Sequence, residues 1–182
     1  YLKREDLYLP EERKALFLNS LYPADAYIRD YFRKAALDEL LSKGIPVCLV
    51  GEGLHKYSHK NEQLLTKEKP VSFALSFEKI AKEQILLNVS PIFAHGLHDR
   101  VLAGMANHTA VLTDENPYLK QIFPENTVAF YSLAAPETLS EAAGRLMEDA
   151  HYREQVKETA YLEFKAHHTW ENRAEQLLEW TK

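Results

Sequence analysis

The stretch that decides the fold is ILLNVSPIFAHGLHDRVLAGMANHTAVLTDENPYL, residues 85–119. It opens with a short apolar run, passes through a loop that holds Pro91 and Gly96, and ends with a second apolar run before Pro117. Between the two runs, apolar residues recur at helical spacing after His98. The pattern predicts a strand, a loop, a helix and a second strand, the unit from which parallel α/β sheets are built. In such sheets, ligands bind at the loops that follow the strands.

The composition is that of a soluble globular protein with one core. The chain has 182 residues, 46% of them hydrophobic and 27% charged, a size that favours one domain over two. No apolar run reaches the ~20 residues that cross a bilayer, and no signal-peptide pattern opens the chain, so we expect a cytoplasmic protein. The formal net charge of −5 disfavours nucleic acid as the main partner. The chain begins with Tyr1 rather than Met, which suggests a piece of a longer protein.

The part before this stretch is expected to alternate strands and helices. Ser20 and Asp25 are candidate N-caps of the first helix, and Gly44 is placed to end it. Ser76 is expected to cap the second helix, and the polar residues 54–69 to form a surface loop with a short helical turn. The expected elements are a linker over residues 1–13, a strand over 14–19, a helix over 24–42, a strand in the apolar run 45–50, a short strand over 70–75 and a helix over 77–84.

The part after this stretch is expected to end in helices. Thr138 or Ser140 is expected to cap the first long helix, and Thr169 to cap the last one, with Trp170 packed against the domain. The expected elements are a short helix over residues 116–123, a strand over 127–133, a helix over 136–148 and a helical tail over 150–182 with a break at 167–169. The whole order predicts a single α/β, Rossmann-like domain with a parallel sheet, helices on both faces and a C-terminal helical tail.

The loop and first helical turn of the 85–119 stretch form the leading candidate for a binding site. A helix N-terminus presents unsatisfied N–H groups that suit a diphosphate, and a glycine lets the backbone come close to it. Arg100 could add a bidentate contact to phosphate oxygens. Alternatively, Asp99 only caps the helix while Arg100 pairs with it or with solvent. The candidate residues are His95, Gly96, His98, Asp99 and Arg100.

Two further candidate groups stand where strands end. Thr113, Asp114 and Glu115 close the second strand of the stretch, where side-chain oxygens could bind ligand hydroxyls. Alternatively, Asp114 and Asn116 only form the turn before Pro117. Gly51 and Glu52 follow the strand in residues 45–50. The carboxylate of Glu52 could accept hydrogen bonds from a ribose there. Alternatively, the two residues form a plain turn.

A metal site is not expected. His55 and His59 have a spacing that can ligate a metal on a helix, but no third ligand lies nearby in the sequence. The histidines and Asp99 of the loop sit on consecutive turns without a cysteine or a distant fourth ligand. Cys48 is the single cysteine and lies in the apolar run IPVCLV, so we expect a buried core thiol.

The motifs resemble a known family. LLNVSP, AHGLHDRVLAGMANHTAVLTDENPYL and HHTWENRAEQLL, in residues 84–121 and 165–178, are similar to the C-terminal domain of GT-B glycosyltransferases of the family-1-like group, which includes the spore-maturation CgeB-type proteins. The resemblance implies that this half binds a nucleoside diphosphate sugar as donor substrate, with no cofactor and no catalytic metal. It also implies a missing N-terminal Rossmann-like domain that carries the acceptor site, so the isolated chain is expected to lack a complete active site.

The family pattern is broken at two positions. Many retaining GT-B enzymes have two glutamates, eight positions apart, whose places fall on His95 and Ala103 here. Both carboxylates are absent, so the catalytic residue stays unassigned. A second hypothesis is therefore a Rossmann-like scaffold or partner-binding domain that has lost donor binding. A flavodoxin-like or receiver-like domain is disfavoured because the helical tail is longer than those folds need.

Overall fold

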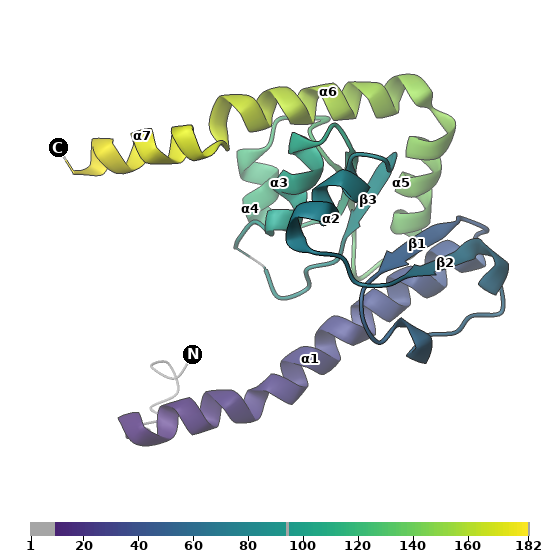
Figure 1. Ribbon diagram of the computed structural model, residues 1–182, viewed down its shortest axis with the longest axis horizontal. Coiled ribbons are helices and arrows are strands. Elements are labelled where there is room, and N and C mark those ends of the chain that lie inside the picture. Colours follow the sequence, from purple (N-terminus) through teal and green to yellow (C-terminus); the bar gives the residue numbers. More distant parts are fainter. Residues whose placement is uncertain (1–9, 94, 182) are drawn as a thin grey trace.

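The computed structural model describes residues 10–93 and 95–181, and its helices and strands alternate along the chain (Figure 1). In order, the elements are α1 (Glu11–Ser42), β1 (Val47–Val50), the short 3-10 helices η1 (Leu54–Lys56) and η2 (Glu62–Leu64), β2 (Leu65–Glu68), α2 (Phe73–Ile80), β3 (Ile85–Asn88), α3 (Asp99–Ala106), β4 (Ala110–Asp114), α4 (Pro117–Ile122), β5 (Ala129–Tyr131), α5 (Glu137–Glu148), α6 (Ala150–His167) and α7 (Trp170–Trp180). The predicted α/β class is confirmed.

The strands are parallel and lie in two sheets. β1 pairs with β2, and β4 lies between β3 and β5, so the described strands form a pair and a triplet rather than one continuous sheet. The strand–loop–helix–strand unit predicted from residues 85–119 is present as β3, α3 and β4. The carboxyl ends of β3, β4 and β5 therefore meet at one edge of the triplet.

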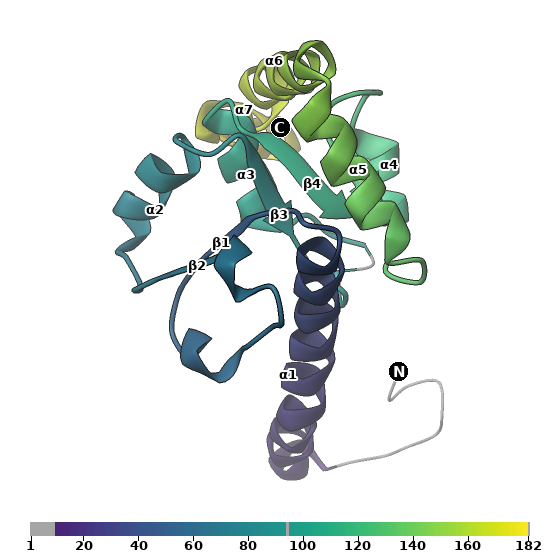
Figure 2. The ribbon, with the colours of Figure 1, turned by 90° about the vertical axis from the view of Figure 1, so that its right-hand side faces the viewer.

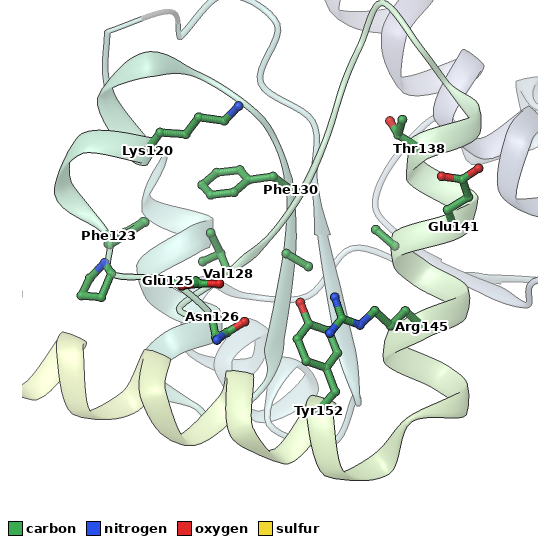
Figure 3. A pocket seen from close by; sticks show the side chains of 13 residues that line it. Lys120, Phe123, Glu125, Asn126, Val128, Phe130, Thr138, Glu141, Arg145 and Tyr152 are labelled. Atoms are coloured by element: carbon green, nitrogen blue, oxygen red, sulfur yellow. The ribbon is translucent and has the colours of Figure 1, made fainter.

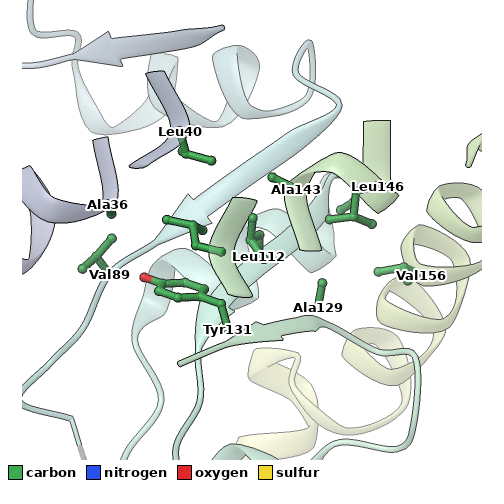
Figure 4. Packing of buried hydrophobic residues seen from close by; sticks show 11 residues of the cluster. Ala36, Leu40, Val89, Leu112, Ala129, Tyr131, Ala143, Leu146 and Val156 are labelled. Carbon is green, nitrogen blue, oxygen red and sulfur yellow. The ribbon is translucent and has the colours of Figure 1, made fainter. Parts of the chain in front are cut away.

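Helices cover both faces of the triplet, as Figures 1 and 2 show. β4 is buried over its whole length and alternates between the two faces: Ala110 and Leu112 belong to one hydrophobic cluster and Val111 to the other. The first cluster includes residues from α1, α5 and α6, and the second includes residues from α3, α4 and α6. Figure 4 shows part of the first cluster, in which Leu40, Tyr131 and Leu146 gather around Leu112.

The beginning of the chain differs from the prediction. Residues 14–19, predicted as a strand, are part of α1, so Ser20 and Asp25 lie inside that helix and cap nothing. A short apolar run does not distinguish a strand from a helix, and Pro23, which suggested a break, lies within the helix. Most of the linker predicted over residues 1–13 falls outside the described residues, and the rest begins α1. Gly44 follows the helix with a φ of 81°, as predicted.

The region around β2 was also predicted incorrectly. β2 lies in the polar stretch predicted as a loop, because a strand at a sheet edge can be polar and so lacks an apolar signal. α2 begins within the strand predicted over residues 70–75, and its N-cap is Ser72, whose side chain accepts from the N–H of Leu75, rather than Ser76. Cys48 is exposed on β1, so the prediction of a buried core thiol is wrong.

The C-terminal helices largely follow the prediction. α6 and α7 are separated where expected, and Thr169 forms a reciprocal capping box with Asn172. Trp170, predicted to pack, is 88% exposed. α5 begins without a side-chain cap, and Thr138 instead accepts a hydrogen bond from the backbone N–H of Ser132.

Gly104 provides a test of how closely α3 packs on the triplet. A Cβ at this position would lie 2.5 Å from Cγ2 of Val111 and 3.0 Å from Cδ2 of Leu86. We expect Gly104→Ala to lower the free energy of unfolding by roughly 1–3 kcal/mol because the packed side chains must shift. The matched control is Gly144→Ala in α5, where no atom lies within 4 Å of the new Cβ. The free energy of unfolding of Gly144→Ala should rise by roughly 0.5–1 kcal/mol, because alanine has the higher helix propensity. Urea unfolding measures both variants, and equal changes in their free energies of unfolding would contradict the packing of Gly104 described here.

Candidate functional site

Asn88 is the centre of a hydrogen-bond network at the carboxyl ends of the strands. Its Nδ2 donates to Oγ1 of Thr113 at 3.0 Å, and its Oδ1 accepts from Oγ of Ser90 and from Nη1 of Arg100, each at 3.2 Å. Its backbone carbonyl accepts from the hydroxyl of Tyr131 at 3.1 Å. This side chain is 1% exposed, so the network fixes β3, β4, β5 and α3 relative to one another.

Asp114 is a buried carboxylate at the end of β4. Its Oδ1 accepts the backbone N–H of Ser90 at 2.7 Å, and the residue is 4% exposed. Burial raises the pKa of this carboxyl above its ordinary value, and the hydrogen bond from Ser90 offsets part of that rise. Burial and the nearby Asp114 also raise the pKa of Tyr131. Asp114 is therefore a buried acidic group at the carboxyl end of β4, the edge at which parallel sheets generally bind ligands.

The loop between β3 and α3 is tied to α4 by Asn116. The Nδ2 of Asn116 donates to the carbonyls of Phe93 at 3.0 Å and Gly96 at 3.3 Å. Its Oδ1 accepts the N–H of Leu119 at 2.8 Å and so caps α4. Asn116 therefore shapes the turn before Pro117 and also positions the predicted binding loop.

His98 is the N-cap of α3, and it uses the backbone donors of the first turn. Its Nδ1 accepts the N–H of Arg100 at 3.1 Å, and its carbonyl accepts the N–H of Val101 at 3.0 Å. Burial first, and then the charge of Arg100, lower the pKa of His98, which favours the neutral ring that this cap needs. Two of the N–H groups expected to bind a phosphate therefore already have partners within the protein.

Arg100 holds a positive charge without a carboxylate partner. Within the described residues, no acidic side chain lies within 4.0 Å of its guanidinium, and the hydrogen-bond partner is the neutral amide of Asn88. Burial lowers the pKa of Arg100, and the positive charge of Arg33 on α1 lowers it further. The alternative in which Arg100 pairs with Asp99 is therefore not observed. A guanidinium held by an amide keeps donors available for an anion.

The larger cavity lies between the two sheets and has a volume of about 1040 Å³. Arg33 and Arg100 both line it, as do Gly51, Glu52 and Gly53, which follow β1. Arg33 has its nearest acidic group at 4.0 Å, in the exposed Asp30. Two arginines from distant parts of the chain thus line one cavity, and its charged lining also includes three acidic residues and three lysines: Asp30, Glu52, Glu83, Lys34, Lys56 and Lys79.

The other residues predicted from the sequence do not line this cavity. His95 and Asp99 are exposed, while Thr113 and Asp114 are buried with protein partners. Glu115 is exposed and pairs with Lys120, which lowers the pKa of its carboxyl. The structure therefore divides the predicted site: Gly51, Glu52 and Arg100 come together at the cavity, and the rest form its support or lie on the surface.

The smaller cavity, of about 620 Å³, lies beside β5 (Figure 3). Its walls come from α4, the loop that leads into β5, α5 and the start of α6. The guanidinium of Arg145 lies 3.6 Å from the ring centroid of Tyr152, and Lys120 approaches from the opposite side. None of the binding residues predicted from the sequence lines this cavity. The smaller cavity is therefore not the predicted binding site.

The described residues show neither a metal-binding cluster nor a membrane-spanning helix. In residues 10–93 and 95–181, no three His, Cys, Asp or Glu side chains are grouped so that they could hold a metal ion. In the same part of the chain, no helix is long and apolar enough to pass through a membrane. His59 contacts the backbone N–H of Asn61 through its Nδ1 at 3.1 Å.

Sequence reasoning missed four residues of the site. Asn88 and Ser90 stand at the end of the apolar run of β3. Polar residues at the end of a buried strand could therefore have marked these two as site residues. Tyr131 lies 43 positions from Asn88, and Arg33 lies on a helix far from the site in sequence. No pattern in the sequence could place these two, because only the packed fold brings them near.

Comparison with known proteins identifies a family and a fold. A family model described as glycosyl transferase-like matches residues 29–179. No curated protein matches the chain significantly. One of the similar solved structures is that of Anabaena Alr3699/HepE in complex with UDP-glucose, with a TM-score of 0.56, 11% sequence identity and coverage of 72% of this chain. The chain spans 40% of the length of that structure, and at this identity the likeness shows the fold alone.

The buried carboxyl of Asp114 predicts a pH-dependent stability difference. Because its pKa is higher in the folded than in the unfolded chain, its stabilising effect is full below the unfolded pKa and is lost as pH rises through the folded pKa. Asp114→Asn keeps an acceptor for the N–H of Ser90 but does not ionise. We expect the free energy of unfolding of Asp114→Asn to increase relative to that of the wild type as pH rises from about 4 to about 7. Urea unfolding across this range tests it, with Asp30→Asn, whose side chain is 80% exposed, as the control. A constant difference would contradict the assignment.

Proposed function

Because this chain belongs to the glycosyl transferase-like family, we propose that it is the nucleotide-sugar-binding half of a glycosyltransferase, which transfers a sugar from a nucleoside diphosphate donor to an acceptor. The observation that carries the proposal is the pair of guanidiniums of Arg33 and Arg100 at the larger cavity. Among the described residues, Arg100 has no acidic side chain within 4.0 Å and Arg33 has only the exposed Asp30 at 4.0 Å, so a diphosphate would add a closer anionic partner for both. Planar guanidiniums also match phosphate oxygens in bidentate geometry.

The diphosphate is proposed to bind mainly through side chains. His98 already uses the N–H groups of Arg100 and Val101, so the helix N-terminus contributes less than the sequence suggested. When the sugar leaves, negative charge grows on the diphosphate, and a prepositioned guanidinium stabilises that charge in the transition state. Asn88 is proposed as a positioning residue, because it holds the guanidinium of Arg100 through Oδ1.

The nucleoside is proposed to lie near the end of β1. Glu52 lines the larger cavity, where its carboxylate can accept hydrogen bonds from ribose hydroxyls. Gly51 and Gly53 flank it and remove side-chain bulk from the same wall. Thr113 and Asp114 have protein partners and support the loop rather than contact the sugar in this proposal.

The acceptor is proposed to bind on another domain. The chain spans 40% of the length of the UDP-glucose-bound structure that it resembles, which supports a second Rossmann-like domain in the complete enzyme. The isolated chain should then bind donor without transferring sugar. A CgeB-type relationship and a cytoplasmic location complete the proposal.

Two observations favour a second candidate function, a scaffold that has lost donor binding. His98 occupies the N–H of Arg100 that a phosphate would otherwise take, and the places of the family's paired glutamates hold His95 and Ala103. In that case the guanidiniums would serve packing, and no nucleotide would bind.

Titration calorimetry with UDP, GDP and ADP separates the two functions. We expect binding of at least one nucleotide, and Arg100→Ala should weaken it by roughly 10- to 100-fold because a charge-assisted hydrogen bond is lost. Arg100→Lys should retain part of the affinity, since it keeps the charge without the planar fork. Arg145→Ala, which removes a guanidinium from the smaller cavity, is the matched control and should bind as the wild type does. No heat with any nucleotide would favour the scaffold.

A further inference from the structure

β5 has a partner strand on one side only. It is paired with β4, and within the described residues no strand lies beyond it. The smaller cavity is lined by Val128, Ala129 and Phe130, which follow one another in the chain. Successive residues of a strand point to opposite faces, so a cavity that all three line lies at the edge of the sheet. Figure 3 shows it between α4, which carries Lys120, and α5, which carries Arg145.

The register of the sheet fixes which backbone groups of β5 point to this open edge. β4 and β5 are parallel, and the N–H of Glu115 donates to the carbonyl of Tyr131 at 2.9 Å. In a parallel ladder, every second residue of a strand directs both its N–H and its C=O to the same neighbour, so Ala129 and Tyr131 face β4. Val128 and Phe130 therefore direct their N–H and C=O groups away from β4, to the open edge.

The outward backbone groups of Val128 and Phe130 have no hydrogen-bond partner in residues 10–93 and 95–181. Val128 is only 5% exposed, and a buried N–H or C=O that stays unpaired is costly in free energy. The open edge ends at Ser132, whose N–H donates to Oγ1 of Thr138 at 2.8 Å. Two consecutive outward positions of β5 thus each present one donor and one acceptor to the cavity.

The same cavity contains a cation without an anionic partner. The guanidinium of Arg145 lies 3.6 Å from the ring centroid of Tyr152, and none of the described residues forms a hydrogen bond or an ion pair with it. A guanidinium stacked on a ring keeps its in-plane N–H donors available for a carboxylate. Lys120, the other cation of the lining, already forms an ion pair with Glu115.

Two carboxylates of the lining bear on the charge of the cavity. They belong to Glu125 and Glu141, and neither forms an ion pair with Arg145. Figure 3 shows Glu125 across the cavity from the guanidinium, near α4, and Glu141 farther along α5. The region around Arg145 and Tyr152 is therefore the part of the cavity where an anion is favoured.

We propose that the open edge of β5 binds an extended peptide segment of another protein as an additional strand, with an acidic side chain of that segment on Arg145. An extended backbone presents the donors and acceptors that Val128 and Phe130 need, and its carboxylate matches the guanidinium. A small anion alone would pair with Arg145 and leave the backbone groups unpaired. The cavity volume of about 620 Å³ also falls within the range of roughly 300–1,000 Å³ that is usual for binding sites.

The peptide site is separate from the candidate donor site. The smaller and the larger cavity have no lining residue in common. A peptide on β5 would therefore leave Arg33 and Arg100 uncovered, and a partner protein could be held while the larger cavity is occupied. The proposal does not depend on which ligand the larger cavity takes.

A phage-displayed library of random linear peptides, selected on the 182-residue chain, supplies the probe. We expect the enriched peptides to combine an acidic residue with residues that favour strands. Amide hydrogen exchange of the chain is then followed by NMR with and without a synthetic copy of the enriched peptide. Exchange at Val128 and Phe130 should slow at least ~10-fold, because their N–H groups gain acceptors. Ala129 and Tyr131, which already donate to β4, are the internal control and should change little.

The role of Arg145 is tested by variants of the chain and of the peptide. Arg145→Gln should weaken peptide binding roughly 10-fold or more, because a charge-assisted hydrogen bond is lost. Changing the acidic residue of the peptide to its amide should weaken binding to the wild type to a similar extent and binding to Arg145→Gln much less. Arg13→Gln removes an exposed arginine on α1, controls for the change in net charge, and should bind as the wild type does.

Several outcomes would overturn the proposal. A selection that enriches no peptide, a peptide that leaves exchange at Val128 and Phe130 unchanged, or equal binding to the wild type and Arg145→Gln would each do so. Protection confined to another part of the chain would also count against the β5 edge. Amide exchange of Arg145→Gln without peptide checks that the variant keeps the fold. No nucleotide is present, so failure of donor binding in the calorimetric test leaves these readouts unchanged.

Discussion

The burial of β4 on both faces is the constraint on which the rest of the fold depends. A strand without a solvent side needs helices above and below it, and α5 and α3 meet that need through the two hydrophobic clusters. The strand ends in Thr113 and Asp114, which are polar and still buried. Their hydrogen-bonding groups need protein partners, and Asn88 and Ser90 provide them. The network at the candidate site thus follows from the same burial that holds the sheet together.

The electrostatics of the site follow from the type of partner that Arg100 has. A carboxylate beside a half-buried guanidinium would neutralise it and compete with any anionic ligand. An amide orients the guanidinium through one oxygen and leaves its charge in place. Burial lowers the pKa of Arg100, the positive charge of Arg33 lowers it further, and the negative charge of Asp99 acts in the opposite direction. A bound anion would favour the charged guanidinium in the same way as Asp99 does.

The sequence predicted the elements whose signals are local. β3, α3 and β4 were found because apolar runs, helical spacing and turn residues agree over residues 85–119. β2 was missed because its residues LTKE carry no apolar signal, and the start of α1 was misread because an apolar run beside Pro23 fits a strand as well. For the site, Arg100 could be found from its place after a loop. Its partnership with Asn88 and its proximity to Arg33 depend on packing between distant segments, which no local pattern encodes.

The separation of the strands into a pair and a triplet has a mechanical consequence. In the described chain, β1 is hydrogen-bonded to β2 and not to β3, so no ladder of backbone bonds fixes the distance across the larger cavity. One wall of that cavity belongs to the triplet, whose strands are locked in register, and the other is held by side-chain packing and by its connection to α1. In the proposed function, the diphosphate would meet Arg100 on the stiff wall and Arg33 on α1, whereas the base and ribose would meet the compliant wall. A site built in this way can hold the reacting end of a donor at a fixed place while it adjusts its width to the nucleoside.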